Sequence, residues 1–120
     1  MRLLPLALLI LCSACPAFAA DQDANKRLFR DYVETVFNKR QIDAADRYLA
    51  DRLIEHNPNL PQGLAGRKKF LANVFAGFSD YHGEIQEILA EGDKIVVRIL
   101  WTGTQDGPFV ANWVAANHAF

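Results

Sequence analysis

The sequence is poor in cysteine and has no apolar run long enough to cross a membrane. Its two cysteines, Cys12 and Cys15, both lie close to the N-terminus. The leucine-rich run over residues 3–11 is about half as long as the roughly 20 apolar residues that a transmembrane helix needs. The rest of the chain is therefore expected to hold no disulfide, no thiol chemistry and no membrane span.

The first nineteen residues instead have the features of an export signal. Arg2 supplies the positive start, the leucine-rich run follows, and Ala17 and Ala19 form a small-residue cleavage site. We therefore predict a signal peptide over residues 1–19, cleaved before Ala20, and a single domain over residues 20–120. The predicted location is periplasmic or secreted.

The sequence also lacks an excess of charge of one sign. Of its 13 Lys and Arg residues, Arg2 leaves with the signal, so 12 remain against 14 Asp and Glu. Such a balance gives no basic footprint for nucleic acid and no polybasic patch for a membrane surface. The chain has no glycine-rich phosphate loop and no nucleophile elbow, and its histidines lack the spacing of metal ligands. No metal and no cofactor are expected.

The predicted domain, residues 20–120, begins with helical periodicity. Apolar residues recur at i, i+4 and i+8 over residues 23–38, which predicts an amphipathic helix. A second short helix is expected with Asp43 as its N-terminal cap, and a third helix is expected over residues 67–78. Residues 51–57, "DRLIEHN", suggest a short strand or extended segment that ends at Pro58.

The period changes to that of strands after the third helix. "YHGEIQEILA" and "KIVVRILWTGT" are joined by a tight turn at Gly92, and this predicts a long antiparallel hairpin. "FVANWV" is expected to begin the next strand. Helices that precede antiparallel strands indicate an α+β fold, with helices on one face of a curved sheet and a cavity between them.

Two stretches carry a resemblance to a known family. "VETVFNKRQIDAADRYLADRLIEHNPN" and "GLAGRKKFLANVFAGFSDYHGEIQEILAEGDKIVVRILWTGTQDGPF" resemble the SnoaL-like polyketide cyclases, also called ester cyclases. These proteins have the nuclear transport factor 2 fold. The resemblance implies a cone-shaped α+β barrel with an apolar pocket, cofactor-free acid–base chemistry on a carbonyl compound, and a homodimer. The family pattern continues through two further strands, which carry the catalytic acid of the polyketide cyclases, and we expect these strands to be missing here.

His56 and Asn57 are the first candidates for the site. The resemblance places His56 in the pocket, where an imidazole is suited to general acid or base work. The alternative is a histidine that bonds the loop backbone beside Pro58. Asn57 could orient a ligand carbonyl, or it could satisfy the turn as an Asx residue. Glu55 is expected to point to the opposite side from His56.

Three further residues are candidates for ligand binding. Arg98 stands in an apolar strand and could hold a carboxylate or enolate in the cavity, or lie on the outer surface paired with Glu87. Trp101 could wall the pocket or belong to the core. His82 could lie at the mouth of the cavity or at a solvated junction between helix and strand.

These observations predict an exported protein with an apolar pocket for a small apolar or carbonyl-containing ligand. As an enzyme it would cyclise or isomerise a carbonyl compound without a cofactor, with His56 moving the proton and Asn57 and Arg98 orienting the substrate oxygen. The alternatives are a periplasmic binding or accessory protein without chemistry, and an inactive fragment of a cyclase-like gene.

Overall fold

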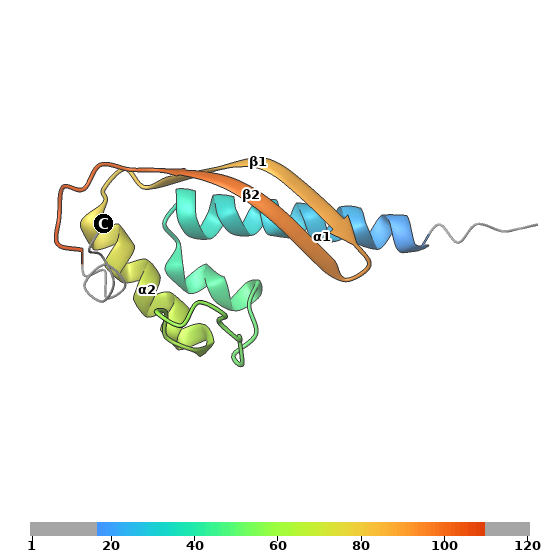
Figure 1. Cartoon of the computed structure of the whole chain (residues 1–120), viewed down its shortest axis with the longest axis horizontal. Coiled ribbons are helices and arrows are strands. Elements are labelled where there is room, and N and C mark those ends of the chain that lie inside the picture. Colours follow the sequence, from blue (N-terminus) through green and yellow to red (C-terminus); the bar gives the residue numbers. More distant parts are fainter. Residues whose placement is uncertain (1–16, 110–120) are drawn as a thin grey trace, which may run out of the picture.

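The computed structural model describes residues 17–109. Helix α1, Ala17–Tyr32, continues into a π-helical turn, η1, over Val33–Asn38, and a short 3-10 helix, η2, follows at Ile42–Arg47. Helix α2 spans Gly63–Gly77, and the strands β1 and β2 span His82–Glu91 and Lys94–Thr102. The hairpin lies along α1, and α2 lies below it (Figure 1). Helices packed against an antiparallel sheet confirm the predicted α+β class.

The helices differ from the predicted ones mainly at their starts. The first runs from Ala17, so cleavage after Ala19 would remove its first three residues. Helix α2 begins four residues before the predicted Arg67, at Gly63, whose φ of 76° is left-handed. The prediction that Asp43 caps the second helix is wrong. Asp43 lies inside η2, and its carboxylate is 3.5 Å from the Lys68 ammonium.

The segment before α2 forms no strand. Residues 53–57 have neither helical nor strand structure, and residues 58–60 turn. The two ends of this loop are held together, because Gly63 donates its N–H to the Leu53 carbonyl and Leu64 donates its N–H to the Asp51 carbonyl. Of the two alternatives predicted for this segment, the strand is therefore excluded.

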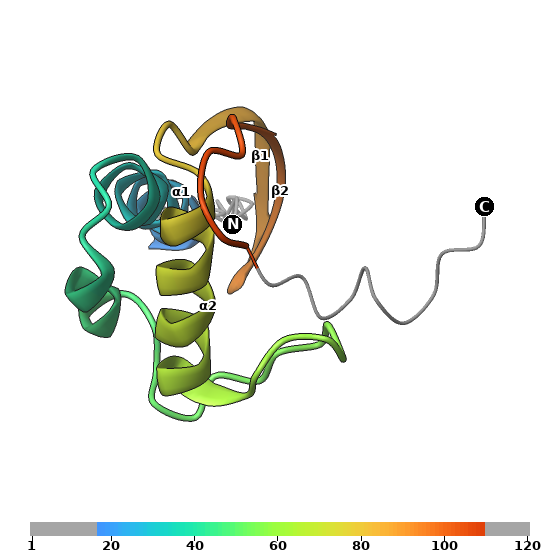
Figure 2. The same cartoon turned by 90° about the vertical axis from the view of Figure 1, so that its left-hand side faces the viewer.

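The predicted hairpin is confirmed. Strands β1 and β2 pair antiparallel from His82 opposite Thr102 to Glu91 opposite Lys94, with a bulge between Ile85 and Glu87. Gly92 in the turn has φ of 59°, a conformation that costs glycine little. Seen along α1, the hairpin curves around the helices (Figure 2). The predicted start of the next strand falls largely on residues 110–120, which lie outside the described residues.

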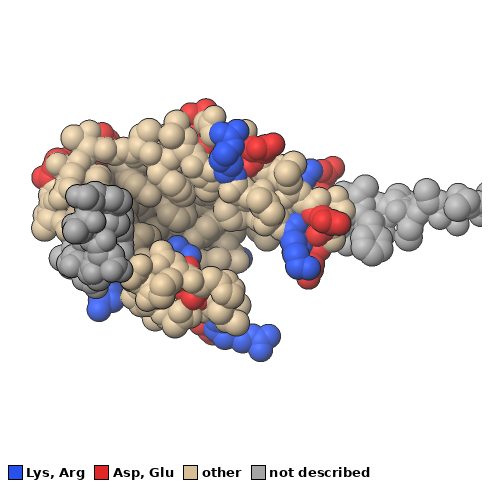
Figure 3. Space-filling model, viewed as in Figure 1, with Lys and Arg blue, Asp and Glu red and all other residues tan. Residues whose placement is uncertain are grey.

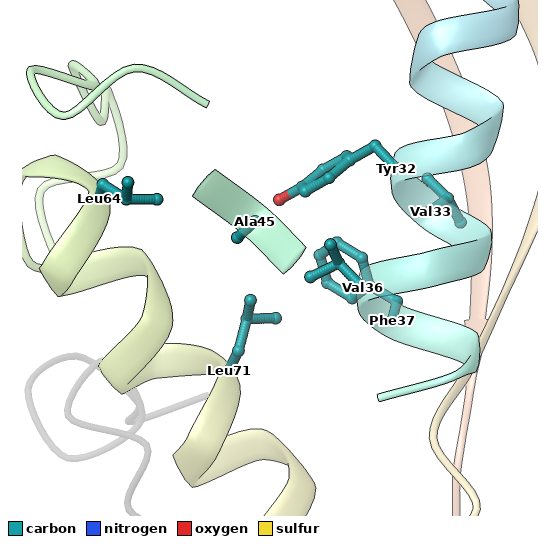
Figure 4. Packing of buried hydrophobic residues seen from close by; sticks show 7 residues of the cluster. All are labelled: Tyr32, Val33, Val36, Phe37, Ala45, Leu64 and Leu71. Carbon is teal, nitrogen blue, oxygen red and sulfur yellow. The ribbon is translucent and has the colours of Figure 1, made fainter. Parts of the chain in front are cut away.

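The core lies where the helices meet beneath the hairpin. Val36 and Leu71 are fully buried, and Ala45 of η2 lies between them (Figure 4). Complete burial of a side chain the size of leucine or valine stabilises a fold by roughly 1.5–3 kcal/mol. Ile85, Ile99 and Trp101 of the hairpin pack against this cluster from one side. The core therefore fixes which face of the hairpin turns inward.

Two polar side chains at the end of η1 connect distant elements. The Arg40 guanidinium donates to the carbonyls of Phe75, Phe78 and Ser79 at 2.6–3.0 Å, so it satisfies orphan acceptors at the end of α2. The Asn38 amide accepts from the Gly83 N–H at 2.9 Å and donates to the Gly83 carbonyl at 3.1 Å. These bonds tie η1 to both α2 and β1.

Candidate functional site

His56 and Asn57 are both exposed to solvent. The side-chain oxygen of Asn57 accepts a 3.0 Å hydrogen bond from the Asn59 N–H, which is the Asx turn expected as the alternative role for Asn57. The loop that carries both residues lies below the hairpin, beside the start of α2, in both views (Figures 1 and 2). The structure therefore does not bring His56 and Asn57 together with Arg98.

Glu55, next to His56, is the residue of this loop that turns inward. Its side chain is 12% exposed, and its carboxylate contacts the Arg67 guanidinium, which is 23% exposed. The same carboxylate accepts from the Asn57 N–H at 3.0 Å, and the Gln62 amide bonds both the N–H and the carbonyl of Glu55. The expected opposition of Glu55 and His56 holds, but the acid and not the imidazole is the partly buried group.

The three remaining candidates lie on or beside the hairpin. Arg98 is 68% exposed on the outer face and sits 3.6 Å from the Glu87 carboxylate, as its second alternative predicted. His82 is exposed at the first position of β1. Trp101 is half-buried and stacks on Tyr81 with the ring centres 5.1 Å apart. Trp101 is thus part of the packing beneath the hairpin.

An apolar pocket lies between α1, the two residues that follow η2, and the turn of the hairpin. Its volume is about 190 Å³, slightly above the 150 Å³ or so of a cavity that admits benzene. The face of the molecule that includes the hairpin is hollowed beneath it (Figure 3). The lining is mainly aromatic and aliphatic: Asn25, Leu28, Phe29, Tyr32, Tyr48, Leu49, Asp93 and Ile95. None of the five predicted site residues lines this pocket.

Tyr32 lines the pocket and is the more deeply buried of its two phenols. Its ring is 8% exposed, and its hydroxyl points away from α1 toward Ala45 and the side of α2 (Figure 4). Burial raises the pKa of the Tyr32 hydroxyl above its ordinary value; the positive charge of Arg67 opposes this shift and Glu55 adds to it. Tyr32 is therefore a neutral phenol at physiological pH.

The second phenol of the pocket, Tyr48, is bonded to a carboxylate. Its hydroxyl donates to Asp31 at 2.6 Å, and the Thr35 hydroxyl donates to the other carboxylate oxygen at 3.2 Å. The bond from Tyr48 is the main reason why the pKa of Asp31 lies below its ordinary value. Asp31 is therefore ionised at neutral pH, and Tyr48 presents a lone pair on its oxygen beside the pocket.

A family profile described as SnoaL-like polyketide cyclase matches residues 27–118. The chain belongs to the SnoaL-like polyketide cyclase family. The resemblance drawn from the two quoted stretches is thus confirmed, and membership supports a function of the cyclase or isomerase type. No curated protein matches the chain.

Two solved structures have the same fold. TsrD from Streptomyces laurentii is 22% identical, with a TM-score of 0.67 over 76% of this chain and 67% of its own. A protein from Acidithiobacillus ferrooxidans, provisionally assigned as a polyketide cyclase, is 30% identical with a TM-score of 0.58. The alignment covers 67% of this SnoaL-like chain and 61% of that relative. The expected nuclear transport factor 2-like architecture is confirmed.

The described part of this SnoaL-like chain was found to hold neither a metal cluster nor a membrane-spanning helix. Within residues 17–109, no three His, Cys, Asp or Glu side chains are grouped so that they could hold a metal ion. No helix in the same range has the length and hydropathy needed to cross a membrane. Lys and Arg side chains lie beside Asp and Glu on the face in Figure 3, so that face carries no patch of one sign. The pocket and its two phenols remain the best candidate site.

Sequence reasoning missed Asp31, Tyr32 and Tyr48. The sequence pattern alone marks Tyr32 and Tyr48 as parts of apolar helix faces and Asp31 as part of a solvated one. The available signal was a tyrosine within each apolar stripe, since a buried phenol must find a partner for its hydroxyl. The partner of Tyr48 stands 17 residues away in the sequence, so no local pattern reveals it.

Proposed function

We propose that this protein catalyses cofactor-free acid–base chemistry, a cyclisation or isomerisation, on a small carbonyl compound bound between α1, η2 and the hairpin turn. The observation that carries the proposal is a pair of phenols in one apolar pocket, of which Tyr48 is bonded to an ionised carboxylate at 2.6 Å. Family membership supports the reaction class. An apolar enclosure with a few polar groups is the usual form of a small-molecule site.

The two phenols would have different roles. Tyr32, held neutral by burial, would donate its proton in a hydrogen bond to the substrate carbonyl and stabilise the enolate oxygen that forms. Tyr48 would take a proton from the carbon beside that carbonyl while its own proton passes to Asp31. The electrons of the broken C–H bond enter the enolate, and the reverse transfer delivers the proton to a new position.

The assignment of His56 as the proton shuttle makes a competing prediction. An imidazole can act as an acid or a base at physiological pH, but His56 lies in the exposed loop and not in the pocket lining. One assay decides between the two assignments: the rate at which the methyl group of acetophenone acquires deuterium in D₂O, followed by proton NMR. This reaction needs only the carbonyl donor and the base.

We expect Tyr48→Phe and Asp31→Asn each to reduce the enzyme-dependent exchange rate by about 10²-fold or more, because a positioned acid or base typically contributes 10²–10⁴-fold. His56→Ala serves as the matched control and should retain the wild-type rate. Loss of exchange in His56→Ala alone would return the shuttle to His56. Binding of acetophenone with no exchange in the wild-type protein would instead favour a binding protein without chemistry.

We also propose export and a homodimer. The outer face of the hairpin exposes Leu89, Val96 and Leu100 at 59, 70 and 51%, and Arg98 beside Glu87 provides charges of both signs for a self-complementary contact. Val96→Asp should convert a dimer to a monomer in sedimentation velocity, whereas a wild-type monomer at micromolar concentration would reject this interface. Export is tested by the intact mass of the protein from a secreted or periplasmic fraction, which should begin at Ala20.

A further inference from the structure

The lining of the pocket has an asymmetry of charge that the proposed reaction does not use. Besides the two tyrosines, two polar residues line the pocket: Asn25 of α1 and Asp93 of the hairpin turn. Asp93 is the one charged residue among those that line the pocket, and no lysine or arginine lines it. The walls beyond are apolar or aromatic.

The nearest positive charges around this pocket already have partners or lie outside its lining. Lys94 is 3.8 Å from the Asp93 carboxylate, but both side chains are over 80% exposed, so this contact is weak and readily displaced. Lys26 pairs with Asp23 at 3.7 Å. At the other end, the Arg47 guanidinium lies 5.4 Å from the ring of Tyr48, and the Tyr48 hydroxyl contacts the ionised Asp31.

We propose that the pocket selects ring compounds that carry an amine and discriminates against those that carry a carboxylate. The ring would occupy the apolar wall formed by Phe29, Leu49 and Ile95, and the ammonium group would reach Asp93 at the open end, in place of Lys94. A carboxylate in that position would face Asp93 with no lining cation to balance it. This inference rests on the pocket of the proposed function and adds the charge class of its ligand.

Three probes that share a phenyl ring separate charge from shape: 2-phenylethylamine, 2-phenylethanol and phenylacetate. Each is titrated into the full chain at low salt, and amide shifts are followed in ¹H–¹⁵N spectra. Two unit charges about 4 Å apart in water interact strongly enough to change affinity about fivefold. We therefore expect the amine to bind about fivefold more tightly than the alcohol, and phenylacetate to bind most weakly, with shifts at Phe29, Leu49 and Ile95.

Substitutions then test the residue that carries the preference. Asp93→Asn should bring the amine and the alcohol within about twofold of each other, and Lys94→Gln should increase the preference for the amine. Glu84→Gln is the matched control, because Glu84 is an exposed acid of β1 opposite Leu100, far along the hairpin from the turn. It should leave the order of the probes unchanged.

The outcomes separate this inference from the function on which it rests. Equal binding of amine and alcohol at the pocket, or a preference for phenylacetate, overturns the charge selection and leaves the pocket in place. A preference for the amine that persists in Asp93→Asn overturns the role of Asp93. Shifts from all three probes that fall outside α1, η2 and the hairpin turn overturn the pocket itself.

Discussion

The two faces of strand β2 are similar in composition and opposite in environment. Val97, Ile99 and Trp101 turn toward the helices and are half-buried, whereas Val96, Arg98 and Leu100 turn outward and are exposed. Alternation along a strand decides which residues share a face. It does not decide which face is covered. Here the cover comes from Tyr32, Val36 and Phe37, which belong to α1 and η1.

The strongest test of this difference removes one large side chain from each face. Trp101→Ala should lower the free energy of unfolding by about 3 kcal/mol, the low end of the range for a buried aromatic, because Trp101 packs on Phe37 and Tyr81 and is half-buried. Val96→Ala on the outer face should change it by less than about 0.5 kcal/mol. Urea unfolding measures both. Equal losses would show that the two faces are equally covered.

A smaller loss of stability is expected at Gly83, where the inner face of the hairpin is tightly packed. A β-carbon added at Gly83 would lie 2.3 Å from the ring of Trp101, so the ring must move. Gly83→Ala should therefore destabilise the fold by about 1–3 kcal/mol, the usual cost of overpacking. The neighbouring Glu84→Ala, on the exposed side of the same strand, is the control and should be near neutral. A neutral Gly83→Ala would mean that Trp101 is free to shift.

The smallest effect concerns the outer face. Glu87 and Arg98 are opposite each other in the strand register. The Arg98 Nε lies 3.6 Å from a Glu87 carboxylate oxygen, and both side chains are more than half exposed. A double-mutant cycle with Glu87→Gln and Arg98→Gln should give a coupling of about 0.2–1 kcal/mol, as for other exposed pairs. The coupling should fall further when salt is raised to 1 M. A larger, salt-resistant coupling would indicate that this face is covered in solution, as the proposed dimer requires.

Much of the fold could be predicted from the sequence because its signals are local. The period of 3.6 over residues 23–38 and the alternation around Gly92 both arise from neighbouring residues, and both regions form the predicted type of element, although the helix starts earlier and ends in a π-helical turn. The start of α2 was misplaced because the hydrogen bonds from Gly63 and Leu64 to residues 53 and 51 depend on the tertiary path of the loop. Asp43 was assigned to a cap by its side-chain chemistry, but it pairs with Lys68 of α2 instead.

The candidate site was harder to predict because its contacts join separate elements. The bond from Tyr48 to Asp31 links η2 to α1, and Asp93 reaches the pocket from the hairpin turn. For His56, local chemistry indicated a reactive group, whereas burial depends on how the loop packs. In that packing Glu55 pairs with Arg67 and His56 turns to solvent. Alternation correctly opposed the two residues but did not reveal which of them would face inward.

The bonds from Asn38 to Gly83 have a consequence for how the sheet can grow. One side-chain amide meets both the N–H and the carbonyl of a strand residue, as the backbone of an adjoining strand would. The N–H and carbonyl of Gly83 are thereby unavailable to another strand, and covering an edge in this way is a common protection against unwanted edge pairing. Within residues 17–109, β2 pairs only with β1. The outer edge of β2 is therefore the edge at which a further strand, from this chain or another, can pair.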